Sequence, residues 1–259
     1  MSHPVAIIQA RIGSTRLRGK VLLPLCGSPM LWHIVQRCRA AEGIADVVVA
    51  TTDQPTDEMI VAMCQTHDIP YCRGSEHDVL DRYYQAALRY KADPVLRITA
   101  DCPIVDPGVI AAVLQLHQLS GRRYDIVGAA TGAGALHTDG CHFPDGVDVE
   151  CYSFACLERL WHEAQTPQDR EHVSTYALRN AERFDIGRVY ASKEYGHHRW
   201  TVDHAEDFAF ITAIYEALWM PGRHFGMDEV LDYLERHSEV YALNRQHVGR
   251  EGYEEWWTP

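Results

Sequence analysis

The first 130 residues alternate between short apolar runs and longer segments with helical periodicity, and this order limits the folds open to the chain. Four short runs have the composition of buried strands: Val5–Ile8, Val47–Ala50, Ile69–Cys72 and Val95–Thr99. Three segments between them repeat apolar residues at helical spacing: Met30–Ala41, Thr56–Thr66 and Val79–Tyr90. Because parallel strands joined by helices form right-handed crossovers, the alternation predicts an α/β fold with a mainly parallel sheet.

The second half of the chain is predicted to extend the same domain. Strand-like patterns occur at Val147–Cys151, Phe184–Tyr190 and Arg199–Val202. Helical patterns occur at Phe154–Ala164, Glu171–Asn180, Ala205–Trp219 and Met227–His237. Since no linker divides the chain, residues 1–259 are predicted to form a single domain, with 131–198 as an insertion or arm.

Two further segments stand out by composition. Thr131–Gly140 is rich in glycine and alanine, which predicts a flexible loop or lid. The tail carries Tyr253, Trp256 and Trp257, so we expect it to dock on the body of the protein or on a partner chain.

The overall composition excludes several classes of protein. The formal net charge of −12 argues against a nucleic-acid surface, which needs an extended basic face. No apolar run approaches the roughly 20 residues that span a bilayer, and the N-terminus lacks the layout of a signal peptide. The eight cysteines show no zinc-like spacing, so they are expected to be reduced and mostly buried in a cytoplasmic protein.

A basic loop, residues 10–20, follows the first predicted strand and contains no acid. Gly13 and Gly19 would let its backbone approach a ligand closely, and backbone N–H groups beside cationic side chains suit a polyphosphate. Since the loop begins the first α/β unit, we predict that it binds a triphosphate; the alternative is a solvated basic turn. Its cations are Arg11, Arg16, Arg18 and Lys20.

Two common phosphate-binding motifs are excluded for this loop. A P-loop has four residues between its glycines and a hydroxyl after the lysine, whereas five residues separate Gly13 from Gly19 and Val21 follows Lys20. The dinucleotide-binding pattern G-x-G-x-x-G is absent as well. The loop is therefore a longer, arginine-rich kind of phosphate site.

Two acids are candidate ligands for the divalent cation that a triphosphate requires. Asp101 directly follows the fourth apolar run, and Pro103 would stiffen the turn that presents it. Asp203 follows the predicted strand Arg199–Val202 and precedes a helix, so it is equally placed to cap that helix. Asp101 and Asp203 are therefore candidate ligands of one cation, with helix capping as the alternative for Asp203, and their separation in the sequence does not show whether they lie together.

Several motifs in order resemble the polysaccharide-type cytidylyltransferases, and among them the spore coat polysaccharide biosynthesis protein F group. Three carry the resemblance: QARIGSTRLRGK at 9–20, RGSEHDVLDRY at 73–83 and RITADCP at 97–103. Three more extend it over most of residues 5–215: FPDGVDVE at 143–150, REHV at 170–173 and RWTVDHAEDF at 199–208. The resemblance implies a Rossmann-like nucleotidyltransferase fold, commonly a homodimer whose protruding arm, here 131–198, reaches the neighbouring subunit.

The resemblance also implies roles for individual residues. The loop would wrap the phosphates of CTP, with Arg16 and Lys20 as its principal charges, and Asp101 would complete the catalytic set. Asp101 and Asp203 would hold Mg²⁺. Arg73 and Ser75 would lie beside the cytosine. The implied nucleotide-binding residues are Ala10, Arg11, Gly13, Ser14, Arg16, Lys20, Arg73, Ser75 and Ala100.

The chain departs from the family pattern at two places. Arg18 stands where proline is usual, which adds a charge and removes a restraint on φ. His204-Ala205 stands where Glu-Pro is common, which loosens the start of the helix and leaves the nearby acids intact.

Residues that bind the acceptor are expected in the second half of the chain. Asp145, Asp148 and Glu150 alternate along a predicted strand, so they could face one cleft; a solvated strand face fits the pattern equally well. Arg170 and His172 could bind an acceptor carboxylate or phosphate, and they could equally lie on the surface at the start of a helix.

The resemblance implies transfer of CMP from CTP to a sugar acid or a related acidic acceptor, with release of pyrophosphate. Such a reaction would supply a precursor of a surface polysaccharide or glycoconjugate. A sugar phosphate and a phosphonate stay open as acceptors. The alternatives are a uridylyl or guanylyl transferase and a nucleotide-binding subunit without turnover.

Overall fold

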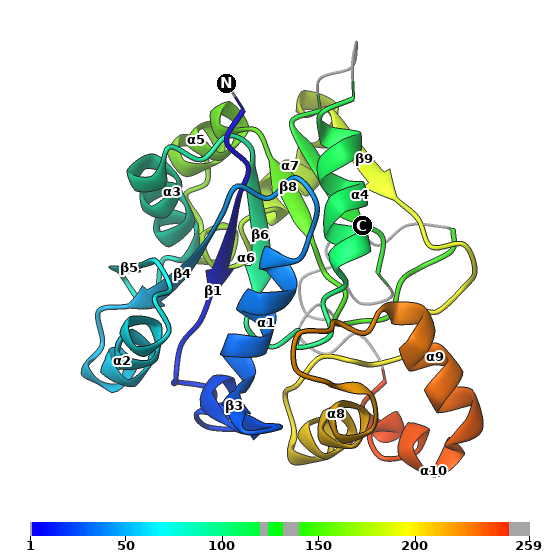
Figure 1. The fold of residues 1–259 in the computed structure, drawn as a ribbon. Helices are drawn as coiled ribbons and strands as arrows, with labels where there is room; N and C mark the ends of the chain where they lie inside the picture. The colour runs from blue at the N-terminus through cyan, green and yellow to red at the C-terminus, as the bar shows by residue number, and fades with distance from the viewer. Residues whose placement is uncertain (1, 120–123, 132–139, 249–259) are drawn as a thin grey trace.

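The computed structural model describes residues 2–119, 124–131 and 140–248, and its centre is a seven-stranded sheet (Figure 1). The strands lie in the order β5-β4-β1-β6-β8-β7-β9. All neighbours are parallel except β8, which runs antiparallel to both β6 and β7. The predicted α/β fold with a mainly parallel sheet is thus confirmed. The strands are β1 (Val5–Gln9), β4 (Asp46–Thr52), β5 (Tyr71–Gly74), β6 (Val95–Thr99), β7 (Ile126–Ala129), β8 (Glu150–Tyr152) and β9 (Ile186–Val189).

Alternate residues of β1 face two separate hydrophobic cores, as the two-residue period of a strand requires. Ala6 and Ile8 belong to one core, and Val5 and Ile7 belong to the other. The first core is covered by α1 (Met30–Arg39), α2 (Glu58–Thr66), α4 (Pro107–His117), α8 (Ala205–Leu218) and α9 (Met227–Arg236). The second is covered by α3 (Val79–Tyr90), α5 (Phe154–Glu163) and α7 (Thr175–Arg179). Helices on both faces bury the central strands of the sheet, which explains why these strands are apolar runs.

The smaller elements complete the fold. Figure 1 shows α8, α9 and α10 together at one end of the molecule. The remaining elements are the hairpin β2 (Pro24–Leu25) and β3 (Ser28–Pro29), α6 (Pro167–His172), α10 (Ser238–Tyr241) and the 3-10 turns η1 (Lys20–Leu22), η2 (Pro55–Asp57), η3 (Ala181–Arg183) and η4 (Arg245–His247).

Most predicted elements form, and two have the predicted bounds, the strand β6 and the helix α3. The predicted helix Glu171–Asn180 is wrong: α6 ends and α7 begins there, because Val173 has a φ of +60°, which no helix tolerates. The predicted strand Arg199–Val202 is also wrong, since a single bridge from Arg199 to Asp145 is its only ladder contact among the described residues.

The strand β7 and the helix α4, which packs on the sheet, were not predicted. The helix α4 is apolar around most of its surface, so it lacks the one-sided pattern that identifies an amphipathic helix. The strand β7 has only four residues, and one of them is glycine. Neither segment has a clear helical or strand period, so the sequence pattern does not distinguish it from a loop.

The described part of the predicted arm, 140–198, is built into the sheet. Its strand β8 lies between β6 and β7, and its helix α5 packs against α3. Contact with a second copy stays a prediction. Most of the predicted lid, 132–139, and the aromatic tail, 249–259, lie outside the described residues.

The lengths of the helices and the state of the cysteines bear on two of the expectations drawn from composition. Among the described residues, the helices are all too short or too polar to cross a bilayer. All eight cysteines are free thiols, and six of them are buried.

Candidate functional site

The basic loop and Asp101 lie at the same edge of the sheet. Gln9 at the end of β1 is in register with Thr99 at the end of β6, so the residues that follow leave the carboxyl edge together. A cavity of about 400 Å³ opens at this edge. It is lined by most of the predicted site residues, namely Ala10, Arg11, Gly13, Ser14, Arg16, Lys20, Ala100, Asp101, Asp145, Asp148, Glu150, His172 and Asp203.

Backbone hydrogen bonds and one buried acid fix the conformation of the loop. The N–H of Gly19 donates to the carbonyl of Ile12 at 3.1 Å, and Gly19 has a φ of +72°, which favours glycine. The N–H of Ile12 donates to the buried carboxylate of Asp57 at 2.8 Å, and the hydroxyl of Thr52 donates to the same carboxylate at 2.5 Å. The loop is therefore closed on itself and anchored beside the end of β4, which directs Lys20 into the cavity.

The ammonium of Lys20 joins the loop to both predicted metal ligands. Its Nζ donates to the carbonyl of Val202 at 2.6 Å and to Oδ1 of Asp203 at 2.9 Å, and it lies 3.5 Å from Oδ2 of Asp101. Burial alone would lower the pKa of Lys20, but the charges of Asp101 and Asp203 outweigh burial and raise the pKa. Lys20 is therefore a buried, permanently charged amine.

Three cations surround the carboxylate of Asp203. Arg16 Nη2 and Lys20 Nζ lie 3.0 and 2.9 Å from Oδ1, and Arg199 Nη2 lies 3.3 Å from Oδ2. Burial would raise the pKa of Asp203, but Lys20 and Arg16 outweigh it and hold the pKa well below its usual range. Asp203 is therefore ionised at neutral pH.

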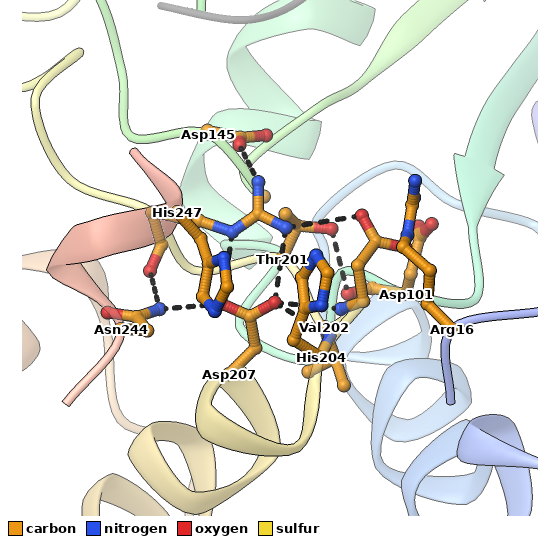
Figure 2. Close-up of polar contacts among 12 residues, drawn as sticks. Arg16, Asp101, Asp145, Thr201, Val202, His204, Asp207, Asn244 and His247 are labelled. Carbon is orange, nitrogen blue, oxygen red and sulfur yellow. Dashed lines mark hydrogen bonds and ion pairs between the residues drawn. The ribbon is translucent and has the colours of Figure 1, made fainter. Parts of the chain in front are cut away.

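Asp203 does not cap α8, which was the alternative role for it; other residues cap this helix. The cap of α8 is His204, and Asp207 accepts hydrogen bonds from the backbone N–H groups of Asp203 and His204 at 3.0 and 2.9 Å. The guanidinium of Arg199 in turn binds Asp207 at 3.0 Å and lies 3.4 Å from Asp145 (Figure 2). Asp203 is thereby free to point into the cavity rather than at the helix.

The segment 199–203 brings Asp203 to the sheet edge from far along the chain. The N–H of Val202 donates to the carbonyl of Asp101 at 2.8 Å, and the N–H of Trp200 donates to the carbonyl of Asp145 at 2.6 Å. Figure 2 shows the segment between these two acids. Its backbone thus joins the loops that carry Asp101 and Asp145.

Gly146 allows this close approach. Its φ is +103°, and a β-carbon at this position would lie 2.5 Å from the backbone of Trp200 and Thr201. Any side chain would push the two segments apart. A glycine after Asp145 is therefore required by the packing.

Asp145 and Asp148 carry a surplus of negative charge into the cavity wall. Burial raises the pKa of Asp145, and the neighbouring Asp148 raises it further, against the opposing charge of Arg199. Burial also raises the pKa of Asp148, although it accepts hydrogen bonds from the Thr131 hydroxyl at 2.6 Å and the Gly146 N–H at 2.8 Å. This part of the site favours a proton or a cation.

The predicted acceptor residues Glu150 and His172 lie farther along the same wall. Glu150 faces Arg97 across the β6–β8 pair, and their ion pair measures 2.8 Å. The hydroxyl of Tyr152 donates to Glu150 at 2.7 Å. Burial lowers the pKa of His172 and the charge of Arg97 lowers it further, so His172 is neutral at pH 7.

Three predicted residues are not among the described lining of the cavity: Arg73, Ser75 and Arg170. The guanidinium of Arg73 binds Glu58 and the carbonyl of Thr52. Arg170 forms a 2.6 Å ion pair with Asp78, the cap of α3, and so holds α6 against that helix. Contacts of Arg73 and Ser75 with a base, and of Arg170 with an acceptor, stay predictions.

The donor set at Asp101 and Asp203 fits a hard divalent cation. Both carboxylates converge on one point, which Lys20 Nζ occupies in this structure. The side chain of Asp101 is 32% exposed and opens to the cavity, so it keeps oxygen lone pairs for a ligand. Mg²⁺ commonly takes one or two carboxylates and completes its shell with phosphate oxygens and water.

Several lining residues were missed in the sequence. Arg199, Arg82 and Arg97 all line the cavity; each belongs to a motif quoted for the resemblance, but none of them was given a role in the site. Asp57 supports the loop from outside the cavity, and its position at the start of a helix gave no sign of this role. These residues reach the site because the fold brings distant segments together, and such contacts cannot be seen in the sequence.

The arrangement can bind a polyphosphate and stabilise charge that develops on it. Cations from the loop, a carboxylate pair suited to a metal and a proton-accepting acid share one cavity. The thiol of Cys102 is an unsuitable nucleophile, because burial and the charge of Asp101 hold its pKa well above the usual range. Direct transfer between two bound substrates suits this site better than a covalent enzyme intermediate.

A family model and a sequence relative both point to the same protein family. A family model described as cytidylyltransferase matches residues 5–238. The chain is 32% identical over 223 residues to spore coat polysaccharide biosynthesis protein SpsF of Bacillus subtilis, an alignment that covers 83% of this chain and 88% of that protein.

Solved structures agree with the sequence match. A cytidylyltransferase from Leptospira borgpetersenii superimposes with a TM-score of 0.84 at 25% identity, covering 92% of this chain and 97% of that one. A CMP:2-keto-3-deoxy-manno-octonic acid synthetase, solved with CTP, superimposes with a TM-score of 0.64 at 20% identity over 83% of this chain and 99% of that one. The second likeness shows a shared fold.

Proposed function

This chain belongs to the cytidylyltransferase family, and we propose that it transfers CMP from CTP to a sugar acid or a related acidic acceptor. Pyrophosphate is the second product. The cytidylylated acceptor serves as a precursor of a surface polysaccharide or glycoconjugate, a role supported by the name of the Bacillus subtilis relative.

The observation that carries this proposal is the position of Lys20. One buried ammonium connects the basic loop with Asp101 and Asp203, so the phosphate-binding and metal-binding halves of the site form a single unit. A protein that only binds nucleotides would not need a cation that contacts both the loop and the two carboxylates. Transfer from a metal-bound triphosphate needs the phosphate-binding cations, the metal and its carboxylate ligands in one site.

The chain's own residues divide the reaction between them. An acceptor oxygen attacks the α-phosphorus of CTP while the bond to pyrophosphate breaks in line, and Arg16 and Lys20 stabilise the charge that grows on the leaving group. Asp145 takes the proton of the acceptor hydroxyl, a role that suits its raised pKa. A magnesium ion held by Asp101 and Asp203 would neutralise charge on the α-phosphate.

An acidic acceptor is favoured by the wall beyond Asp148. Arg82, Arg97 and the neutral His172 line that wall together with Glu150. Guanidinium groups bind carboxylates and phosphates, and a buried glutamate beside them suits sugar hydroxyl groups. This composition supports a sugar acid and leaves a phosphorylated acceptor or a phosphonate as the second candidate.

A pyrophosphate-release screen tests the activity. Purified protein is incubated with CTP, MgCl₂ and a panel of sugar acids, sugar phosphates and phosphonates. We expect release above the acceptor-free control with at least one sugar acid. Release only with a sugar phosphate or phosphonate would move the proposal to that class. Binding of CTP without release from any acceptor would favour the subunit without turnover.

The choice of nucleotide is tested by thermal shift. A ligand that binds only the folded state raises the melting temperature with its concentration. We expect CTP with Mg²⁺ to raise it more than UTP, GTP or ATP at the same concentration. A larger shift with UTP or GTP would replace CTP with that nucleotide.

The resemblance supports a homodimer as the active form. Sedimentation velocity of the full chain measures this without reference to activity. We expect a single species of twice the monomer mass, and a monomer at assay concentration would remove the dimer from the proposal.

A further inference from the structure

Two histidines and a glutamate, residue types that commonly ligate metals, lie together beside the segment 199–203. Within residues 2–119, 124–131 and 140–248, the single group of three or more whose ligand atoms all lie within 4.8 Å of one another is His204, Glu206 and His247. We propose that these three side chains bind one divalent transition-metal ion of the zinc class. This site is separate from the carboxylate pair Asp101 and Asp203.

The spacing of the ligand atoms is close to that of a zinc site. Tetrahedral zinc with Zn–N and Zn–O bonds of about 2.0–2.1 Å has neighbouring ligand atoms roughly 3.4 Å apart. Nε2 of His247 lies 3.5 Å from Oε2 of Glu206. All the ligand atoms of the group lie within 4.8 Å of one another, so a change of side-chain rotamer can bring the three of them onto one ion.

The imidazoles of His204 and His247 are stacked on each other. The ring centroids of His204 and His247 are 4.1 Å apart and the planes differ by 3° (Figure 2). Because an imidazole binds a metal through a lone pair in the plane of its ring, two parallel rings cannot both face one ion. Binding therefore turns at least one ring about its side-chain bonds, and the stacked pair is replaced by two metal bonds.

The donor set selects a different metal from the one expected in the cavity. Two imidazole nitrogens and one carboxylate suit zinc and its transition-metal neighbours, and they leave a fourth position for water. Asp101 and Asp203 offer only oxygen, which suits magnesium. The two sites can therefore be filled independently.

A second observation supports the placement of His247. The side-chain amide of Asn244, three residues earlier, donates to the carbonyl of Arg199 at 2.9 Å and to Asp207 at 3.0 Å. Asn244 is buried, so the chain around His247 is held against the start of α8 before any metal arrives. A site whose ligands are already held in place loses less conformational freedom on binding.

A metal at this position would connect the last described part of the chain to the segment that carries Asp203. His204 follows Asp203 directly, and η4 contributes His247. The ion would tie these two segments together as a cross-link does. Its expected effect is structural, seen as thermal stabilisation.

Cobalt serves as a spectroscopic probe for this site. The full chain, stripped of metal by a chelator and free of any polyhistidine tag, is titrated with CoCl₂ in saturating MgCl₂. We expect a visible absorption band of tetrahedral Co²⁺ that saturates at one equivalent, and an increase in melting temperature with ZnCl₂.

Matched variants locate the ion. His247→Ala should abolish the band, and Glu206→Gln, at a half-exposed position, should weaken binding by at least about tenfold. His237→Ala is the control, because His237 and Glu239 form an exposed pair 3.1 Å apart outside the group of three. Circular dichroism checks folding, and Glu206→Gln decides the question if His247→Ala does not fold.

Three results would overturn the proposal. They are the absence of a band in the wild type, a band of unchanged affinity in both site variants, and loss of the band in His237→Ala to the same degree as in the site variants. None of them depends on CTP or on turnover, so this proposal can fail while the proposed function stands.

Discussion

At the scale of single residues, the site depends on one buried ammonium. Burial of a lysine is costly unless opposite charges lie close to it. Lys20 meets that condition through Asp101 and Asp203, and its pKa is raised as a result. The same carboxylates need Lys20, because without it they would repel each other at the edge of the sheet.

Replacement of Lys20 by methionine keeps the length of the side chain and removes its charge. We expect turnover to fall roughly 10²- to 10³-fold, because the charge on departing pyrophosphate loses a donor. Loss of charged hydrogen bonds should lower the free energy of unfolding by about 1–3 kcal/mol, with the fold retained. Steady-state kinetics and thermal melts measure both. Lys193→Met, at an exposed position, is the control and should change neither turnover nor the free energy of unfolding. Normal turnover in Lys20→Met would refute the role of Lys20.

Asp145 should show opposite effects on activity and stability. Its folded-state pKa is raised, so its contribution to stability is fully present below the unfolded pKa and is lost as pH rises through the folded value. Asp145→Asn should therefore raise the free energy of unfolding at pH 7, and the gain should vanish below the unfolded pKa of an aspartate, about pH 4. Turnover should fall about 10²-fold or more if Asp145 is the base.

Asp207 provides the matched control for this pH dependence. Burial would raise its pKa, but Arg199 outweighs burial and lowers it, so its contribution is present above the unfolded pKa and is lost as pH falls. Asp207→Asn should destabilise the protein at pH 7. Melting temperatures of both variants between pH 4 and pH 8 test the signs, and a destabilised Asp145→Asn would contradict the assignment.

At the scale of elements, the loop between β1 and η1 depends on an anchor outside the site. Asp57 accepts hydrogen bonds from the Ile12 N–H and from the hydroxyls of Thr51 and Thr52. All of these groups are buried, so no water can replace the carboxylate. The loop's shape is therefore maintained by the end of β4.

Asp57→Ala should loosen the loop without touching the substrate. We expect a loss of about 2–4 kcal/mol in the free energy of unfolding, since buried donors lose their acceptor. KM for the nucleotide should rise more than kcat falls, because the loop binds phosphate before reaction begins. Asp53→Ala, at an exposed position on the same connection, is the control. An unchanged KM in Asp57→Ala would show that the loop holds its shape alone.

The elements that the sequence predicted well are those with a clear period. The strand β6 and the helix α3 have the predicted bounds because each carries one unmixed pattern. Patterns fail where tertiary packing decides the outcome. Arg199–Val202 alternates like a strand, yet its backbone bonds go to the loops of Asp101 and Asp145 rather than to a ladder.

The candidate site was predictable to a similar degree. Residues after β1 and β6 could be placed at one edge because strand order in a parallel sheet determines where strands end. The pairing of Asp101 with Asp203 came only from the resemblance and not from their spacing, since it depends on hydrogen bonds between segments a hundred residues apart. The partners of Arg73 and Arg170, which take them out of the described cavity wall, likewise depend on the folded structure.

At the scale of the whole molecule, the site concentrates cations on an acidic protein. The chain carries a net charge of −12, yet the described cavity lining gathers lysine and arginine from four separate segments, in numbers that match its acids. The site therefore lacks the negative excess of the rest of the chain, which favours the approach of a metal-bound polyanion. The parallel sheet makes this possible, because it brings distant loops to a single edge.

The central claim is that the α-phosphate of CTP is transferred to the acceptor. Phosphorus labelling tests it directly, with the acceptor taken from the pyrophosphate screen. With [α-³²P]CTP the label should appear in the cytidylylated acceptor, and with [γ-³²P]CTP it should appear only in pyrophosphate; both products should disappear in Asp101→Ala. Label from the γ-position in the acceptor, or α-label that remains in CMP or CTP at every acceptor concentration, would contradict the account.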